Sequence, residues 1–235
     1  MGEFLFIYRH FEELRQKYPG LFLVCWRGSY SVEGMLHFVA EFNGRFIEDE
    51  YAIKINLPGN YPIAYPVAEE TMGRIPRSFH HYQNGHLCLG VSYAISRTFR
   101  ESPTLIGFTE KSLIPYLYSF SYKSLYGKMP YGELSHGWVG IIEYYSDEFG
   151  IENPRAIVKL LKILADNFPV KHIKCPCGSK KPISLCHGKQ LDSMLLVQSA
   201  SHFKNELLQI ATGIAPEDKL SPIQSFGLRN EVRIR

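Results

Sequence analysis

Three stretches of apolar residues near the start of the chain constrain its fold more than any other feature. Residues 21–27 are nearly all apolar, and residues 35–42 and 46–57 alternate between apolar and polar. Asn43-Gly44 separates the last two, and both residues tolerate the positive φ angles of a tight hairpin. The pattern therefore predicts an antiparallel meander. The side chains expected to face its core are Leu36, Phe38, Ala40, Phe42, Tyr51, Ile53, Ile55 and Leu57.

A helix is expected before these strands, and an irregular passage after them. Apolar residues recur at helical spacing from the start of the chain, at Leu5, Tyr8, Phe11, Leu14 and Tyr18, until Pro19-Gly20. After the third strand, a proline-rich passage predicts a loop that leads into a short last strand near Val67–Met72. Residues 73–104 show no sustained period, and a long structureless stretch inside a compact domain is usually functional.

Helical patterns return in the second half of the chain, which makes the fold class α+β. The expected helices begin near Ser112 with Pro115 in the first turn, run over 136–149 with Ser135 as the cap, start at Asn153-Pro154, and cover about 189–211. Residues 1–170 are expected to form one domain, 171–188 a small motif, and 189–235 a helix with a loose tail. We see no internal repeat.

Composition excludes several classes of protein. A net charge of +3 without a concentrated run of Lys and Arg gives no clear sign of nucleic-acid binding. No stretch approaches the roughly 18 apolar residues of a membrane helix, and the first residues do not resemble a secretory signal. The chain holds 5 cysteines, an odd number, and three of them crowd into residues 175–186. This distribution favours metal or catalytic use in a reducing compartment, so a cytoplasmic location is expected.

The segment Phe79–Gly90 contains the most informative single cysteine, Cys88. His80, His81 and His86 lie close to it in sequence, and a nearby imidazolium stabilises a thiolate. An imidazole, or the amide of Asn84, can also stabilise an oxyanion. Cys88 is therefore a candidate nucleophile. The alternative is that Cys88 is a small buried apolar residue and that the histidines lie on a surface loop.

A second cluster of cysteines has the spacing of a metal site. Cys175, Cys177, Cys186 and His187 supply four ligands and leave no open position, as a structural tetrahedral zinc site requires. Gly178 permits a tight turn after the first pair. The alternative is a redox pair or inert thiols, and four ligand-type residues within thirteen positions argue against it. Cys25, in an apolar strand, is interpreted as a core residue.

The order of elements and the Cys88 loop together resemble the ubiquitin-conjugating enzymes. The match includes Gly85-His86-Leu87-Cys88-Leu89, the upstream Tyr61-Pro62 and Tyr65-Pro66, and the downstream Ser102-Pro103. It covers about residues 3–150. The resemblance implies an N-terminal helix, a four-stranded meander, an active-site loop and C-terminal helices. It also implies that Cys88 carries an acyl group as a thioester. The family's His-Pro-Asn element is missing, and His80 and His81 occupy its region.

This divergence, with Gly132–Gly137 leading into a Tyr-rich helix, resembles the prokaryotic branch of the family that is encoded in antiphage operons. Short members of that branch act on a nucleotidyltransferase that makes a cyclic-oligonucleotide signal. The resemblance therefore implies a protein donor with a free C-terminus, either such a cyclic-nucleotide synthase or a ubiquitin-like protein. The chain has no Gly-rich nucleotide loop, so a separate activating enzyme is expected.

The metal-type cluster resembles the SEC-C motif, a small zinc-binding tail, through Cys175-Pro176-Cys177-Gly178-Ser179 and the closing Cys186-His187. The resemblance implies a docking role for this unit. Two other functions stay open for the whole chain, namely a catalytically silent adaptor and a Cys/His hydrolase. A homodimer also stays open.

Overall fold

The computed structural model describes residues 2–82, 84–130, 135, 137–167, 173–213 and 232–234, with side chains from residue 4 onward. The chain divides into two compact units. Unit 1 contains the described residues within 1–90, 98–132 and 230–235, and unit 2 those within 91–97 and 133–229. Each unit has a hydrophobic core of its own.

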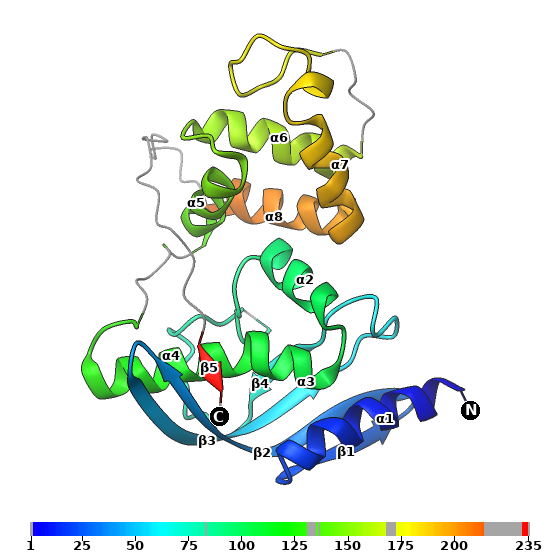
Figure 1. The fold of residues 1–235 in the computed structure, drawn as a ribbon, viewed down its shortest axis with the longest axis vertical. Helices are drawn as coiled ribbons and strands as arrows, with labels where there is room; N and C mark the ends of the chain where they lie inside the picture. The colour runs from blue at the N-terminus through cyan, green and yellow to red at the C-terminus, as the bar shows by residue number, and fades with distance from the viewer. Residues whose placement is uncertain are drawn as a thin grey trace. The chain divides into compact units, whose positions relative to one another are not determined.

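Unit 1 is built on an antiparallel sheet (Figure 1). Helix α1 (Gly2–Lys17) precedes β1 (Leu21–Trp26), β2 (Ser29–Phe42), β3 (Arg45–Asn56) and β4 (Val67–Glu70). The strands follow the order β1-β2-β3-β4, so the predicted α+β class and four-stranded antiparallel meander are confirmed. A further short strand, β5 (Arg233–Ile234), pairs with β2 beside Ala40 and Glu41. The loose tail expected at the end of the chain is therefore a strand over these two residues.

Both hairpins of the meander turn through two residues with positive φ. The φ angles are 49° and 76° at Asn43-Gly44, as predicted, and 51° and 79° at Arg27-Gly28. This pair of left-handed residues matches the natural twist of antiparallel strands. The register therefore places alternate residues of β2 and β3 in the core, and all eight predicted inward side chains are buried: Leu36, Phe38, Ala40, Phe42, Tyr51, Ile53, Ile55 and Leu57.

Two predictions about unit 1 need correction. The expected apolar stripe of the first helix is right for Phe11, Leu14 and Tyr18, which are buried with Ile7, but wrong for Leu5 and Tyr8, which are 68% and 41% exposed. The spacing of the buried residues, four, three and four, keeps them on one helical face. Cys25 is exposed and is not a core residue, because β1 is the edge strand of the sheet.

The passage after β4 is less irregular than expected. Helix α2 (Ser92–Glu101) lies inside it, and α3 (Leu105–Phe108), η1 (Thr109–Leu113) and α4 (Ile114–Tyr126) then follow without a break. The predicted start near Ser112 is wrong, since Thr104 caps the helix by accepting from the Gly107 N–H. Pro115 has no N–H for an intrahelical bond, and the π-helical turn η1 ends two residues before it, at Leu113.

Unit 2 is helical. It contains α5 (Trp138–Phe149), α6 (Pro154–Asp166), the 3₁₀ turn η2 (Ile183–Leu185), α7 (Gly188–Val197) and α8 (Ala200–Gly213). Asn153 caps α6 as predicted, accepting from the N–H groups of Arg155 and Ala156. Ser135 does not cap α5, because its hydroxyl and N–H donate to the Glu143 side chain. The single predicted terminal helix is two helices, separated at Gln198, which is extended.

The helices of unit 2 pack mainly with one another. Helix α6 contacts α8, α5 and α7, and the core includes Leu160, Leu164 and Phe203. Cys175 and Ile183 belong to the same core. The grouping therefore differs from the expected boundary at residue 170, because α5 and α6 pack with the later helices. No helix in the described ranges has the length and apolar character needed to cross a membrane.

Candidate functional site

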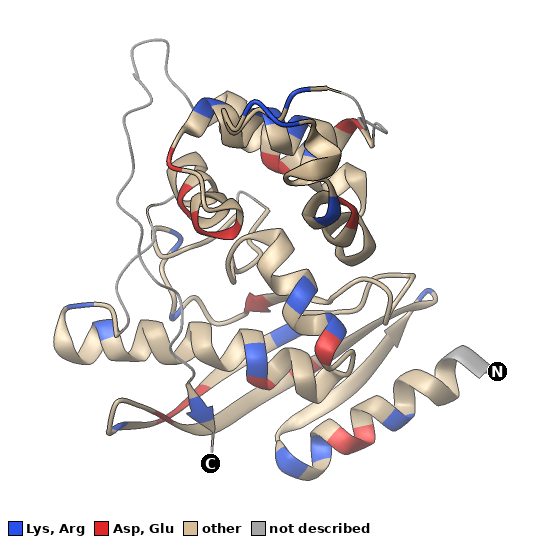
Figure 2. Cartoon of the chain, turned by 45° about the horizontal axis from the view of Figure 1, so that its top comes forward, with Lys and Arg blue, Asp and Glu red and all other residues tan. Residues whose placement is uncertain are grey.

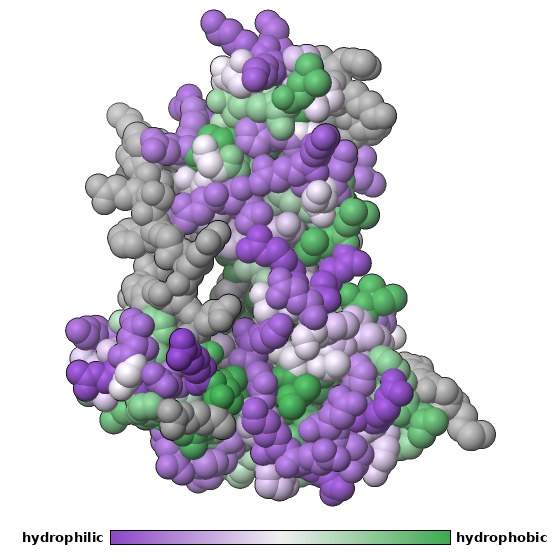
Figure 3. Space-filling view, viewed as in Figure 1, coloured by the Kyte–Doolittle hydropathy of each residue, from purple (hydrophilic) through white to green (hydrophobic). Residues whose placement is uncertain are grey.

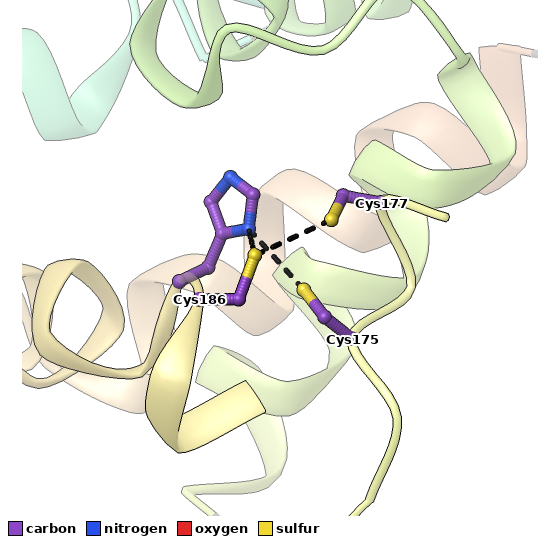
Figure 4. A group of neighbouring side chains, drawn as sticks. Cys175, Cys177 and Cys186 are labelled. Atoms are coloured by element: carbon purple, nitrogen blue, oxygen red, sulfur yellow. Dashed lines mark hydrogen bonds between the residues drawn. The ribbon is translucent and has the colours of Figure 1, made fainter. Parts of the chain in front are cut away.

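The four metal-type residues of unit 2 converge on one point. Figure 4 shows the thiols of Cys175, Cys177 and Cys186 and an imidazole directed toward one another. Their ligand atoms, with His187 as the fourth residue, all lie within 4.8 Å of one another. The chain reaches this arrangement through a tight turn, with φ of 89° at Gly178 and 61° at Lys180, and through a bond from the Cys175 N–H to the Lys181 carbonyl.

The distances between these atoms suit one tetrahedral ion. His187 Nδ1 lies 3.2 Å from the sulfurs of both Cys175 and Cys186, and the sulfurs of Cys177 and Cys186 are 3.5 Å apart. Ligand atoms around a tetrahedral zinc are about 3.5–3.8 Å apart, given Zn–S bonds of about 2.3 Å and Zn–N bonds of about 2.0–2.1 Å. The group can hold a metal ion, and both its donor set and its spacing are compatible with zinc.

Neighbouring groups orient the imidazole of the cluster and shift the pKa values of its thiols. His187 Nε2 donates its hydrogen to the Phe149 carbonyl at 3.1 Å. The other ring nitrogen, Nδ1, therefore carries no hydrogen, faces the thiols and can bind a metal ion. Burial raises the pKa of Cys177, but hydrogen bonds from the side chain and backbone of Ser179 and from the neighbouring thiols outweigh it and lower this pKa to about 6. Burial raises the pKa of Cys175 to about 11. Of these two thiols, Cys177 is therefore the more acidic.

Cys88 lies in unit 1, at the end of a short extended segment. Leu87 is buried, and its N–H donates to the Ala68 carbonyl of β4, while the Cys88 N–H donates to the His80 carbonyl at 2.7 Å. An isolated bridge pairs Leu87 with His81. Since side chains alternate along an extended segment, Cys88 and His86 share the face opposite the buried Leu87. The thiol is half-buried.

His86 is held by two neighbours. Its Nδ1 accepts from the Asn84 amide at 3.0 Å, and its Nε2 lies 3.4 Å from a carboxylate oxygen of Glu69. Asn84 also accepts from the His86 N–H, and Asn56 donates to Glu69 at 2.8 Å. The structure therefore brings Asn84 and His86 together. It also adds Glu69, for which the sequence offers no local signal because it lies in β4, 17 residues before His86.

The other two histidines have different surroundings. His81 Nδ1 donates to the Phe79 carbonyl at 2.8 Å, which directs Nε2 away from that bond. His80 has a positive φ of 43°, is half-buried, and packs its ring edge-on against Phe79. The His80 carbonyl accepts from the Cys88 N–H, so His80 contacts Cys88 through its backbone. His136, the first residue of the helix predicted over 136–149, lies outside the described residues.

Tyr116 of α4 is a further residue at this loop. Its hydroxyl donates to the carbonyls of Phe79 (2.9 Å) and His80 (3.3 Å), and its side chain is buried. Burial raises the pKa of Tyr116, and the charge of a nearby Cys88 thiolate raises it further. Tyr116 thus stabilises the turn at Phe79 and His80, and the His80 carbonyl in turn binds the Cys88 N–H. Only its helical spacing from the buried Leu113 and the partly buried Phe120 marks it in the sequence.

Tyr116→Phe is expected to loosen the loop without changing the core. It removes two hydrogen bonds but keeps the ring, so we expect a loss of about 1 kcal/mol in the free energy of unfolding. Hydrogen exchange at the Cys88 amide should become faster. The control is Tyr118→Phe, which removes a bond to the Arg45 carbonyl from the same helix. Equal exchange at Cys88 in the two variants would contradict the role assigned to Tyr116.

A buried carboxyl lies in the core of unit 2. Glu206 is 1% exposed, accepts from the Tyr145 hydroxyl at 2.6 Å and from the Tyr93 N–H at 3.3 Å, and also bonds the Gln198 side chain. Burial raises its pKa from 4.5 to about 7, against the lowering effect of these donors. The protonated form is therefore favoured by folding.

This shift predicts a pH dependence of stability. The contribution of Glu206 is fully present below pH 4.5 and is lost as the pH rises through about 7, because the folded pKa exceeds the unfolded one. The loss amounts to about 3 kcal/mol at most. Glu206→Gln should flatten this slope, measured by urea unfolding between about pH 4.5 and 8. The exposed Glu152→Gln is the control, and an unchanged slope in Glu206→Gln would exclude this carboxyl as the source.

Comparison of the chain with models of known families, with curated proteins and with solved structures found no match.

Proposed function

We propose that this chain is a cysteine-dependent acyl carrier and transferase that forms a thioester at Cys88. Its helix, four-stranded meander and Cys88 loop follow in the order expected of a ubiquitin-conjugating-enzyme-like fold. The observation that carries the proposal is the anchored position of Cys88. The segment before it is bound to β4 on one side and to His80 on the other, while the thiol stays partly exposed. A nucleophile needs this combination of fixed position and access.

The proposed reaction has two steps. The Cys88 thiolate bonds to the carbonyl carbon of an activated protein C-terminus, and the activating group leaves. An acceptor amine then attacks the same carbon, so the C–N bond forms, the C–S bond breaks and the thiolate returns. Activation requires a separate enzyme, and the donor we favour is a cyclic-nucleotide synthase of a cytoplasmic antiphage system or a ubiquitin-like protein.

The loop residues receive distinct roles in this proposal. His80 fixes the backbone of Cys88, and the free Nε2 of His81 is a candidate proton carrier. His86 is oriented by Asn84 and Glu69, on the same face as the thiol. The same contacts favour a second candidate function, a non-catalytic adaptor, because both ring nitrogens of His86 are already engaged by protein groups.

We assign zinc to Cys175, Cys177, Cys186 and His187 in a structural, SEC-C-like site. Four protein ligands leave no position for a substrate, so the site supplies stability. One zinc per chain, measured by elemental analysis, tests this assignment.

Intact mass of the protein, purified after co-expression with its genomic neighbours, tests the transferase. We expect an adduct that reductant removes and that Cys88→Ala lacks, and its mass identifies the donor. Loss of the adduct with partner binding intact is the expected pattern for Cys88→Ala. A wild-type protein that binds its partners without any adduct would favour the adaptor.

A further inference from the structure

Strand β1 forms one edge of the sheet in unit 1. It pairs with β2 on one side, and no strand within the described residues pairs with its other side. Natural proteins protect such edges with charged residues, prolines or bulges, because an open edge pairs readily with another strand. Residues 20–26 of this chain contain no charged residue and no proline, so β1 is drawn without red or blue in Figure 2.

The hydrogen bonds of the sheet show which backbone groups face outward. The Met35 N–H donates to the Gly20 carbonyl at 3.1 Å, so these two residues form a bonded pair. Bonded and non-bonded pairs alternate along an antiparallel ladder, which directs the backbone groups of Phe22, Val24 and Trp26 toward β2. Those of Leu23 and Cys25 face away from β2, and among the described residues none binds them.

The side chains of the edge are also exposed. Phe22 and Trp26, on the outer face of the sheet, are 54% and 70% exposed, and Cys25 is exposed as well. In the face drawn in Figure 3, apolar side chains (green) reach the surface of unit 1. Exposed apolar side chains beside open backbone groups are typical of a strand that pairs with a partner. An uncharged strand is the partner that matches this uncharged edge.

We propose that β1 pairs antiparallel with β1 of a second copy of this chain, about a twofold axis at Val24. In this register Leu23 of each copy faces Cys25 of the other, so the outward N–H and C=O groups of both residues are bonded. Phe22 then faces Trp26 of the second copy on the outer face, which forms two aromatic pairs. A twofold interface uses the same surface on both copies. Strand β1 meets this condition, because each pair of facing residues lies on the same face of the sheet.

A cross-link tests the register. Val24 would face its own symmetry mate in a non-bonded pair, with Cα atoms about 4.5 Å apart, within the range of a disulfide. Val24→Cys, in a Cys25→Ser background, should form a covalent dimer on oxidation, with the link at residue 24 by peptide mass. Phe46→Cys in the same background is the control, since Phe46 is 50% exposed on β3, away from this edge. It should give no such dimer.

Solution mass tests the dimer itself. Light scattering should give twice the 27.0 kDa of one chain. Val24→Lys places two like charges opposite each other and should raise the dissociation constant on the order of 100-fold, with the circular dichroism unchanged. Phe46→Lys should leave it unchanged. A monomeric wild-type protein overturns the proposal. The same holds if the β1 edge of that monomer pairs with a different protein. A dimer that tolerates Val24→Lys and gives no link at residue 24 also overturns it.

Discussion

Removal of the metal is expected to unfold unit 2 while the sheet of unit 1 persists. The segment 173–187 supplies all four ligands, but only two of its residues, Cys175 and Ile183, are buried, and both belong to the core shared with α6 and α8. Structural zinc contributes an apparent free energy of about 10–16 kcal/mol in small zinc units. Without the ion, nothing balances the negative charge that the cysteines carry as thiolates, so they repel one another or take up protons. Loss of this contribution exceeds the stability of most domains of this size.

The two tryptophans allow the units to be followed separately. Trp138 lies in α5 of unit 2 and Trp26 in β1 of unit 1. In a Trp26→Phe protein, a chelator should shift the emission of Trp138 to the red, whereas hydrogen exchange in β2 and β3 should remain slow. Cys186→Ser should reproduce the effect, and Cys25→Ser should not. Unchanged Trp138 emission after the metal has been removed would contradict a stabilising role.

Cys88→Ser is expected to convert a reductant-sensitive adduct into a resistant one. A serine hydroxyl in place of the thiol gives an oxygen ester, which thiols exchange far more slowly than a thioester, and a less reactive acyl group for the acceptor amine. The donor should therefore accumulate on the variant, and transfer to the acceptor should be lost. Intact mass with and without reductant, and after mild alkali, measures both effects.

The control for this experiment is the other cysteine of unit 1. Cys25 is exposed, and Cys25→Ser should keep the wild-type adduct and its sensitivity to reductant. An adduct that persists in Cys88→Ala would place the chemistry elsewhere. An adduct on Cys88 that only water consumes, with the free acid as product, would identify a hydrolase.

Local patterns in the sequence were enough to predict the meander and the metal cluster. Strand alternation and Asn43-Gly44 are properties of neighbouring residues, and the four ligands lie within thirteen positions of one another. Partners that are distant in sequence had no comparable signal. Tyr116 is 28 residues from Cys88, and Glu206 binds Tyr93 across 113 positions. The exposure of Cys25 likewise depends on the place of β1 at the edge of the sheet, which an apolar run does not reveal.

The pairing of β5 with β2 has a consequence for how the two units depend on each other. Unit 2 occupies most of the chain between α4 and β5, so β5 can pair only by closing a loop that contains that unit. When unit 2 is folded, the effective length of the loop between α4 and β5 is short, and when unit 2 is unfolded, that length is long. Each doubling of the effective loop costs about 0.6 kcal/mol in closure entropy. Events that fold unit 2, metal binding among them, therefore favour the docking of β5 through chain connectivity alone.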